Sequence, residues 1–393
     1  MNIDDHKSEN RDGHPALHAV YLPQVSDNVL AALFADWKSA FPEAGVLALV
    51  PEGEQTRIRQ IQAAANQHSL PLTGALFPAL LTEAGFHQSG ITLLRFDTSP
   101  PCLLLEGLAD QAPSASSDQI VEFATNQLSR QPSHGQPTLF LIFDGLLANI
   151  GTLLHALYQK LEHRVRYAGV NAGSESFQPT LCLFDNTRHV KSACIAFMIP
   201  ATQHVVVEHA YPVSKALFRA TSTDGNRIDQ INGQPALAVY QALLKDEYGV
   251  ELTPENFYQH AVHYPFGLIT ALDVLVRIPV GLTDDGAIHC VGEIPANSVL
   301  RLLHAPELAE SQCVEQIAAQ LPRTEQPLVI FYCAGRRMHF GTAASQELHK
   351  LVIASQSTAL LGALSLGEIG TDKEVGMPVF HNAALLCLAN KTS

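Results

Sequence analysis

Two charged side chains, each preceded by an apolar stretch, are the residues best suited to chemistry in this chain. Arg336 comes after the apolar segment 328–333, and Glu368 follows the segment 361–366. Charge in such surroundings is costly unless it is paired or used. A guanidinium there could bind a carboxylate ligand through two hydrogen bonds. An internal ion pair between Arg336 and Glu368 is equally compatible with the pattern, and both interpretations stay open.

Further polar residues and glycines occur in comparable places. His381 and Asn382 interrupt an apolar stretch, 379–388, and Asn171 lies in a glycine-bearing one. A glycine inside a strand allows the backbone to approach a ligand or a neighbouring element closely. Tight packing alone would also explain each glycine. The residues that we expect to line a ligand site are Arg336, Glu368, His381, Asn382, Gly169, Asn171 and Gly74.

Histidine is abundant, with 18 residues, and a haem needs a single axial imidazole. His209 ends an apolar strand candidate just before Tyr211, and His263 precedes a bend. The sequence has no Cys-x-x-Cys-His, which excludes covalent attachment of a c-type haem. If haem b binds, His209 is the first candidate for its axial ligand, ahead of His263 and His381. A structural role for each histidine remains the competing interpretation.

Signatures of enzymes are missing. There is no Gly-x-Ser-x-Gly, phosphate loop, dinucleotide fingerprint or His-Glu-x-x-His. Cys333 and Ser365 could serve a hydrolase as nucleophiles, but no accompanying base with its orienting partner can be recognised. We therefore expect no catalytic residues and no enzymatic activity, with the hydrolase as the alternative from a different class.

Composition narrows the class of protein. The 393 residues are 47% hydrophobic and carry a net charge of −14, which argues against nucleic acid or an anionic membrane as partner. The longest apolar runs are too short to span a bilayer, and the polar N-terminus lacks a signal-peptide core. The seven cysteines are widely spaced and contain no Cys-x-x-Cys, as in reduced core cysteines. These features predict a soluble, cytoplasmic protein without membrane insertion.

A loose internal repeat organises the chain. Each of its three passes begins with a continuous apolar strand, continues with a helix and a glycine-bearing strand, and ends with a further strand. Fully apolar strands of this kind are typical of sheets covered by helices. The first strands are 45–50, 138–143 and 328–333; the helices are 55–67, 147–162 and 343–355; the glycine-bearing strands are 72–77, 167–173 and 361–364; the last strands are 91–96, 181–184 and 379–388.

The sequence thus predicts an α/β (mixed α+β) fold with mixed sheets covered by helices, built from loosely repeated strand–helix–strand–strand units in two halves. We expect a disordered tail at 1–14 and halves at 15–200 and 201–393. Alanine, serine and proline favour a loop at 109–118, followed by a short helix at 119–129. Between the second and third passes, a distinct segment includes a turn at 224–226, a helix at 236–245 and a strand at 269–276.

Several short motifs, in their order and spacing, resemble the FIST family (F-box and intracellular signal transduction proteins), and the likeness covers most of the chain. The first part contributes Gly74-Ala75-Leu76-Phe77-Pro78, Phe143-Asp144-Gly145-Leu146 and the stretch 169–174. The middle part contributes Asp224-Gly225-Asn226-Arg227-Ile228, Asn232-Gly233-Gln234-Pro235-Ala236 and Tyr264-Pro265-Phe266-Gly267. The last part contributes Cys333-Ala334-Gly335-Arg336, Leu366-Gly367-Glu368-Ile369 and Phe380-His381-Asn382.

Two departures from the family pattern stand out. The stretch 15–23 lacks the usual small-residue cluster, and His209-Ala210 replaces the His-Gly pair that relatives often have. The second departure keeps an imidazole at this position but removes the glycine, so the local backbone can differ.

The resemblance implies a sensory module that binds a small ligand. One bacterial branch of the family binds haem, senses nitric oxide and signals to histidine kinases and cyclic-di-GMP enzymes. The resemblance leads us to expect a stand-alone sensor whose ligand lies at the seam between the halves and whose output passes to a separate histidine kinase or cyclic-di-GMP enzyme. Haem with nitric oxide is narrowly preferred, and an amino acid or other small carboxylate is the alternative ligand.

Overall fold

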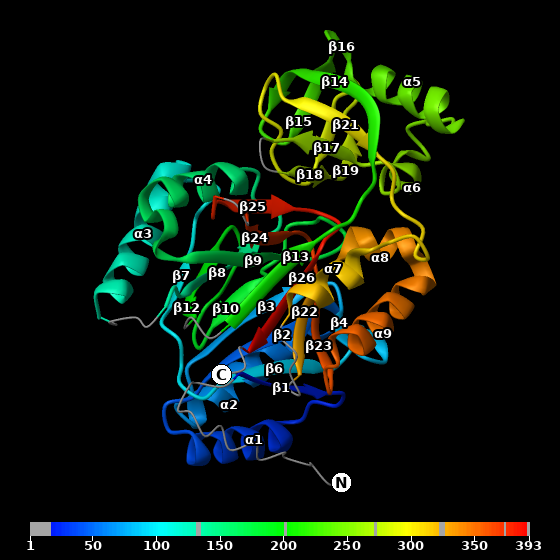
Figure 1. The fold of residues 1–393 in the computed structure, drawn as a ribbon. Helices are drawn as coiled ribbons and strands as arrows, with labels where there is room; N and C mark the ends of the chain where they lie inside the picture. Colours follow the sequence, from blue (N-terminus) through cyan, green and yellow to red (C-terminus); the bar gives the residue numbers. More distant parts are fainter. Residues whose placement is uncertain are drawn as a thin grey trace.

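The computed structural model describes residues 17–130, 135–199, 203–270, 273–321, 327–372 and 375–390. The predicted tail, 1–14, lies outside the described residues. The predicted fold class is confirmed, since helices cover sheets of mixed strand direction (Figure 1).

Three units with one topology are present, as the predicted repeat requires. The last strand of the second unit is 194–199, however, and not the predicted 181–184, which pairs into the first sheet. In each unit a helix connects two parallel strands, and a later strand pairs antiparallel with the first of them. The first unit contains β2 (Gly45–Pro51), α2 (Ile58–Gln67), β3 (Leu72–Phe77) and β6 (Ile91–Phe96). The second contains β8 (Thr138–Asp144), α4 (Ile150–Leu161), β9 (Arg166–Ala172) and β12 (Cys194–Ile199). The third contains β22 (Leu328–Cys333), α9 (Ala344–Ser355), β23 (Leu360–Ser365) and β26 (Leu385–Asn390).

The edges of the three sheets link the units to one another. On one edge, each sheet is extended by a strand that pairs with its last strand: β1 (Leu17–Leu22), β7 (Cys102–Leu105) or β13 (Gln203–Glu208). On the other edge, each unit sends a hairpin into a neighbouring sheet. Hairpin β4–β5 (Leu80–Thr82, Gly85–His87) of the first unit joins β23; β10–β11 (Leu183–Asp185, His189–Val190) of the second joins β3; and β24–β25 (Glu368–Thr371, Pro378–His381) of the third joins β9. The exchange is cyclic, so each sheet is completed by a different unit.

A shared core explains why the central strands are apolar on both faces. Side chains from all three sheets meet in one cluster, in which the ring of Phe331 lies 5.7 Å from that of Phe77 and 6.2 Å from that of Phe140. The outer faces are covered by helices, which leaves the central strands no solvent-facing side. The remaining helices of the units are α1 (Asp27–Ala40), α3 (Pro113–Arg130), α7 (Cys313–Gln320) and α8 (Ala334–Phe340), with short 3₁₀ turns η1 (Glu52–Arg57), η2 (Glu162–Arg164) and η3 (Gly341–Ala343).

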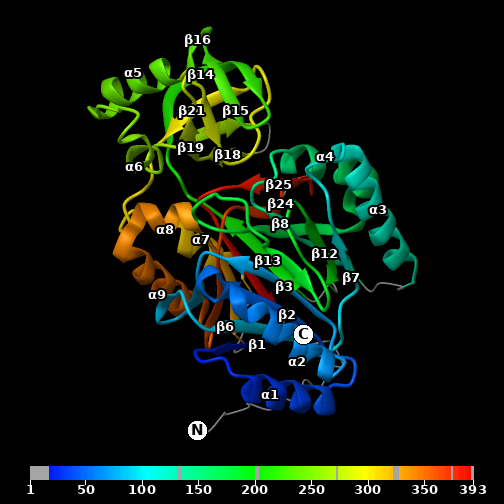
Figure 2. The ribbon, with the colours of Figure 1, turned by 180° about the vertical axis from the view of Figure 1, so that it is seen from behind.

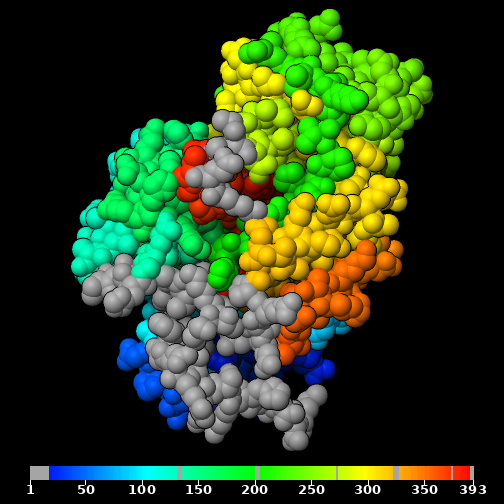
Figure 3. Space-filling model, viewed as in Figure 1, coloured from blue at the N-terminus to red at the C-terminus, as the bar shows by residue number. Residues whose placement is uncertain are grey.

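A separate domain, which we call the inserted domain, interrupts the third unit between β13 and α7. It has its own sheet and its own hydrophobic core and projects from the body formed by the three units (Figures 1 and 2). In the space-filling view the outline narrows between this domain and the body, and residues coloured red are visible at that level (Figure 3). Its elements are β14 (Val213–Asp224), β15 (Arg227–Ile231), β16 (Gln234–Pro235), α5 (Ala236–Tyr248), α6 (Phe257–Ala261), β17 (Phe266–Ile269), β18 (Val274–Arg277), β19 (Pro279–Leu282), β20 (Ile288–Cys290) and β21 (Val299–Leu303).

Some predicted elements differ from those observed. The stretch 379–388 forms two strands, because the chain turns at Ala383, where φ is +58°. The predicted strand 269–276 is instead the hairpin β17–β18, and part of the predicted loop 109–118 belongs to α3. Helix α8 follows β22 directly and was not predicted.

The repeated glycines lie at equivalent positions and face backbone. A Cβ on Gly169 would lie 2.1 Å from the carbonyl oxygen of Leu141, and one on Gly362 would lie 1.7 Å from that of Ile330. A Cβ on Gly74 would lie 2.7 Å from the carbonyl oxygen of Ala48 and would also meet the ring of Phe184. Close packing of the parallel strands therefore accounts for these three glycines.

We predict that Gly362→Ala lowers the free energy of unfolding by at least about 2 kcal/mol, because its methyl group overlaps a backbone oxygen that cannot move alone. The matched control is Gly281→Ala, also in a strand, where the nearest atom lies 3.9 Å from the added Cβ. Urea denaturation of both variants measures the difference. Equal midpoints for the two would contradict the packing role of Gly362.

Candidate functional site

Most of the polar residues predicted for the site come together where the second and third units meet. Strand β24 begins at Glu368, which pairs with Val170 of β9 on one side and with His381 of β25 on the other. The hairpin that the third unit sends into the second sheet therefore places Glu368 and His381 beside the end of β9.

The two asparagines join this group through Gly367. The backbone N–H of Asn171 donates to the carbonyl of Gly367 at 2.9 Å, and a Cβ on Gly367 would lie 3.3 Å from Nδ2 of Asn382. Both asparagine side chains are buried. The structure thus gathers Asn171, Glu368, His381 and Asn382, whereas Gly74 lies in the first sheet.

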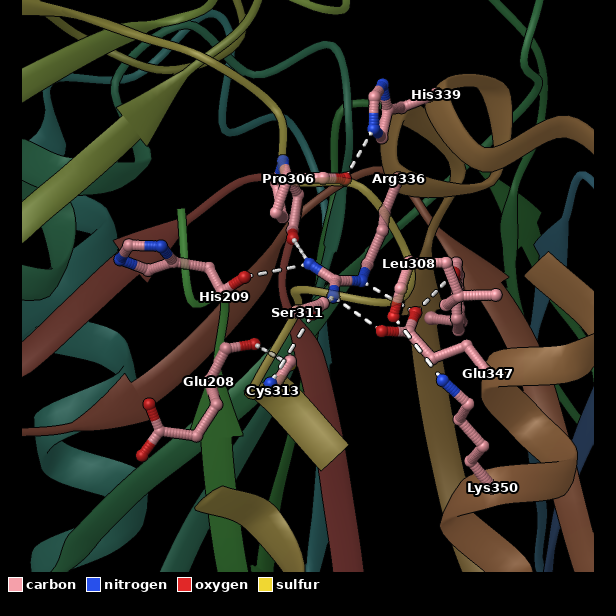
Figure 4. A network of polar contacts seen from close by, with 12 residues as sticks. Glu208, His209, Pro306, Leu308, Ser311, Cys313, Arg336, His339, Glu347 and Lys350 are labelled. Atoms are coloured by element: carbon pink, nitrogen blue, oxygen red, sulfur yellow. Dashed lines mark hydrogen bonds and ion pairs between the residues drawn. The ribbon is translucent and has the colours of Figure 1, made fainter. Parts of the chain in front are cut away.

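Arg336 is completely buried, and its charge is balanced by Glu347 on α9. Nε and Nη2 of Arg336 donate to the two carboxylate oxygens of Glu347 at 2.8 and 2.6 Å (Figure 4). The Tyr332 hydroxyl donates to the same carboxylate at 2.6 Å. Of the two interpretations left open for Arg336, the internal ion pair with Glu368 is therefore not formed. Helix α9 brings a better placed carboxylate to the guanidinium, and both oxygens can accept at once.

The remaining hydrogen bonds of Arg336 tie three chain segments together. Nη1 donates to the backbone carbonyls of His209, at 2.8 Å, and of Ala383, at 3.2 Å, while Nη2 also donates to Oγ of Ser311 at 3.0 Å. The His209 imidazole points away from the guanidinium (Figure 4). With these bonds made, Arg336 holds backbone segments in place and has few hydrogen-bond donors left for a carboxylate ligand.

Glu368 has a local network of its own. The Ser365 hydroxyl donates to Oε1 at 2.6 Å, and the N–H of Ala384 donates to Oε2 at 3.3 Å. Burial raises the pKa of Glu368 from 4.5 to about 8, with these hydrogen bonds opposing the shift. At neutral pH this carboxyl group is therefore mostly protonated and neutral.

The two candidate nucleophiles are buried away from solvent. Ser365 has no exposed surface and Cys333 is 2% exposed. Sγ of Cys333 accepts a hydrogen bond from the N–H of Ala383 at 3.0 Å, and burial raises the pKa of the thiol well above its usual value. A neutral buried thiol is a poor nucleophile.

Several buried polar atoms at this junction have no hydrogen-bond partner among the described residues. They include both amide atoms of Asn171, Oδ1 of Asn382, Nδ1 of His381 and the hydroxyl of Tyr211. Buried polar groups are nearly always hydrogen-bonded, since leaving one unpaired costs about 1–3 kcal/mol. A cluster of such groups indicates that something else satisfies them.

His209 and His381 are neighbours, and Asp273 of the inserted domain lies next to them. The two imidazole rings are 5.6 Å apart, and Nε2 of His381 lies 3.9 Å from Oδ2 of Asp273. One ligand atom from each of the three residues lies within 4.8 Å of the other two. We call His209, Asp273 and His381 the triad. It is the group at this junction with the donor types that could hold a metal ion.

His263, the other haem candidate, is engaged elsewhere. Its Nδ1 lies 2.6 Å from Nδ1 of His339, whose Nε2 donates to the carbonyl of Pro306 at 2.9 Å. Burial, followed by the neighbouring His339, lowers the pKa of His263. The pair connects the inserted domain with α8.

Sequence reasoning missed two residues of the junction. Glu347 lies within the predicted helix 343–355, and its distance of 11 residues from Arg336 gives no reason to pair them across a 3₁₀ turn. Asp273 was missed because the hairpin around it was predicted as a continuous strand. The polar residues Thr270 and Asp273 inside that predicted strand could have indicated a turn.

We predict that Glu347→Gln lowers the free energy of unfolding by about 3–5 kcal/mol, because it leaves the Arg336 charge buried without its counter-ion. Glu251→Gln is the matched control, since it makes the same change in an exposed pair with Lys245. Guanidinium denaturation at pH 7 compares them. Equal stability of the two variants would show that the Arg336–Glu347 pair is dispensable.

The raised pKa of Glu368 predicts a pH effect. The folded protein keeps this proton up to about pH 8, whereas the unfolded chain releases it near 4.5. Between these values the folded state binds more protons, so stability falls as the pH rises, by about 1.4 kcal/mol for each unit of pKa difference. Glu368→Gln cannot ionise. It should therefore lose less stability than wild type between pH 5 and pH 9, as measured by urea denaturation.

The control for this pH series is again Glu251→Gln, which should keep the wild-type slope. If Glu368→Gln and wild type lost the same stability over this range, Glu368 would have to be ionised in the folded protein at neutral pH.

Comparison with known families identifies matches over most of the chain. The model of the FIST N domain matches residues 22–234, and that of the FIST C domain matches residues 236–371. No curated protein shows significant similarity to the chain. Among the helices in the described ranges, none has both the length and the apolar character needed to cross a membrane.

Proposed function

Because the chain belongs to the FIST family, whose domains are associated with sensory roles in signal transduction, we propose that it is a sensor of a small ligand. The ligand binds at the junction of the second unit, the third unit and the inserted domain. The signal passes to a separate histidine kinase or cyclic-di-GMP enzyme in the cytoplasm.

The observation that carries this proposal is the cluster of buried polar atoms without partners. Asn171, His381 and Asn382 belong to segments that come together at this junction, and all three side chains are at most 4% exposed. Natural proteins keep such destabilising groups chiefly where function needs them. A bound ligand would satisfy them and stabilise the folded state.

Contacts beside this cluster offer a route for the signal. Arg277 of the inserted domain is buried and donates to the carbonyl of Phe380 at 2.9 Å, one residue before His381. Glu293 of the same domain accepts hydrogen bonds from the N–H and the hydroxyl of Thr152 at the start of α4. A ligand that shifts the segment around His381 would therefore change how the inserted domain sits on the body.

The side chains at the junction favour a ligand that a histidine imidazole of the protein can coordinate. A small carboxylate is a less suitable ligand, because the guanidinium of Arg336 is already paired with Glu347. Haem, with nitric oxide as the signal, is one ligand of the favoured type, and His209 would supply its axial nitrogen. The triad nevertheless fits a bare ion better than haem. Haem needs only one axial imidazole, whereas donor atoms of three residues lie within 4.8 Å of one another here.

We predict that Asn171→Leu leaves the ligand-free protein as stable as wild type or more stable, because it removes two buried polar atoms that lack partners. The matched control is Asn186→Leu. That amide accepts from the N–H of Leu72 at 2.8 Å and donates to the carbonyl of Leu70 at 3.0 Å. The control should lose about 1–3 kcal/mol in urea denaturation. A larger loss for Asn171→Leu than for the control would give Asn171 a purely structural role.

Native mass spectrometry of the protein purified from the cells that produce it tests the ligand itself. Wild type should carry an additional non-covalent mass that is reduced or lost in His381→Leu and retained in Asn186→Leu. The same additional mass on all three proteins would place the ligand away from the junction, and it would count against the proposed function. So would the absence of any additional mass on all three.

A further inference from the structure

Three chain segments of different origin supply the donor atoms of the triad. His209 lies in the segment that leads from β13 into the inserted domain, Asp273 directly precedes β18 in that domain, and His381 ends β25 in the body. Their ligand atoms lie within 4.8 Å of one another. This separation is close to the spacing of donors around one metal ion, because metal–ligand distances near 2.1 Å place two donors about 3–4 Å apart.

Each imidazole has contacts that bear on metal binding. Nδ1 of His209 accepts from the N–H of Tyr211 at 3.0 Å, and the ring also forms a hydrogen bond to the backbone of Val274. A metal ion on Nδ1 would replace the contact with Tyr211, and a ring N–H that donates to backbone is the contact that fixes the orientation of a metal-binding imidazole. His381 is 4% exposed, and its Nδ1 has no partner among the described residues.

We propose that His209, Asp273 and His381 bind one divalent transition-metal ion of the zinc and iron(II) class. Two imidazoles and one carboxylate are a ligand set typical of such ions, and three protein ligands leave a position open for water or a small molecule. The inference rests on the proposed function, since it names the ligand that the junction senses. Asp273 belongs to the inserted domain, so the ion links that domain to the body.

Titration of untagged protein with Zn²⁺, after removal of metal by a chelator, tests the site. Isothermal calorimetry should give one ion per chain, and Co²⁺ should give visible absorption bands at the same stoichiometry. His209→Ala, Asp273→Ala and His381→Ala should each weaken Zn²⁺ binding by at least about tenfold. The matched controls, His155→Ala and Asp246→Ala, remove an exposed imidazole and an exposed carboxylate and should bind as wild type does.

Asp273→Ala keeps the test decisive if His381→Ala fails to fold, because the Asp273 side chain is 46% exposed. Wild type that takes up neither Zn²⁺ nor Co²⁺ would overturn the inference. Equal affinity in wild type and in Asp273→Ala would also overturn it, since the ion would then bind elsewhere.

Two further outcomes separate this inference from the proposed function. If haemin gives a Soret band that His209→Ala abolishes, while Zn²⁺ does not bind, the metal inference falls and the sensor stands with haem as its ligand. If Zn²⁺ binds through the triad but leaves hydrogen exchange of residues 274–282 and 378–381 unchanged, the metal inference stands and the proposed route of the signal falls.

Discussion

The buried guanidinium of Arg336 is the constraint on which the junction depends. Glu347 and Tyr332 satisfy its charge, which allows the same group to hold the carbonyl oxygens of His209 and Ala383. These carbonyls belong to the two segments that carry the imidazoles of the triad. A buried ion pair is weak evidence for stability by itself, because desolvation offsets its attraction. Its value here is geometric, since one rigid planar group fixes two backbone segments that are far apart in sequence.

Much of the fold could be predicted, because continuous apolar strands and intervening helices repeat in the sequence. The pattern could not show the cyclic exchange of hairpins, since strand pairing across units depends on contacts between residues such as Val170 and Glu368. Nor could it place a helix directly after Cys333. Four of the expected site residues do lie together, but Arg336 binds Glu347 and not Glu368, because the turn into α9 determines which carboxylate reaches the guanidinium. Asp273 was missed because its position depends on a hairpin that the apolar pattern concealed.

The junction lies where the repeat is interrupted. In the first two units, the strand that begins the unit leads through a short connection to its helix, whereas in the third unit the inserted domain lies between β13 and α7. His209 occupies the start of this insertion, and the hairpin exchanged between the third and second units delivers His381 to the same place. Buried polar atoms of Asn171, Tyr211, His381 and Asn382 that have no partner among the described residues lie at this break. The insertion thus sets the junction apart from the equivalent places in the other two units, which is consistent with the proposed sensor of a single ligand.

The central claim is that the triad forms a metal site, and X-ray absorption spectroscopy of the protein loaded with one equivalent of Zn²⁺ tests it most directly. The account predicts a first shell of nitrogen and oxygen atoms at about 2.0–2.2 Å, with the outer-shell scattering of two imidazoles. In Asp273→Ala, water should take the place of the carboxylate oxygen and the imidazole signal should stay in place. A shell of sulfur atoms at about 2.3 Å, or a spectrum of zinc surrounded only by water, would contradict it.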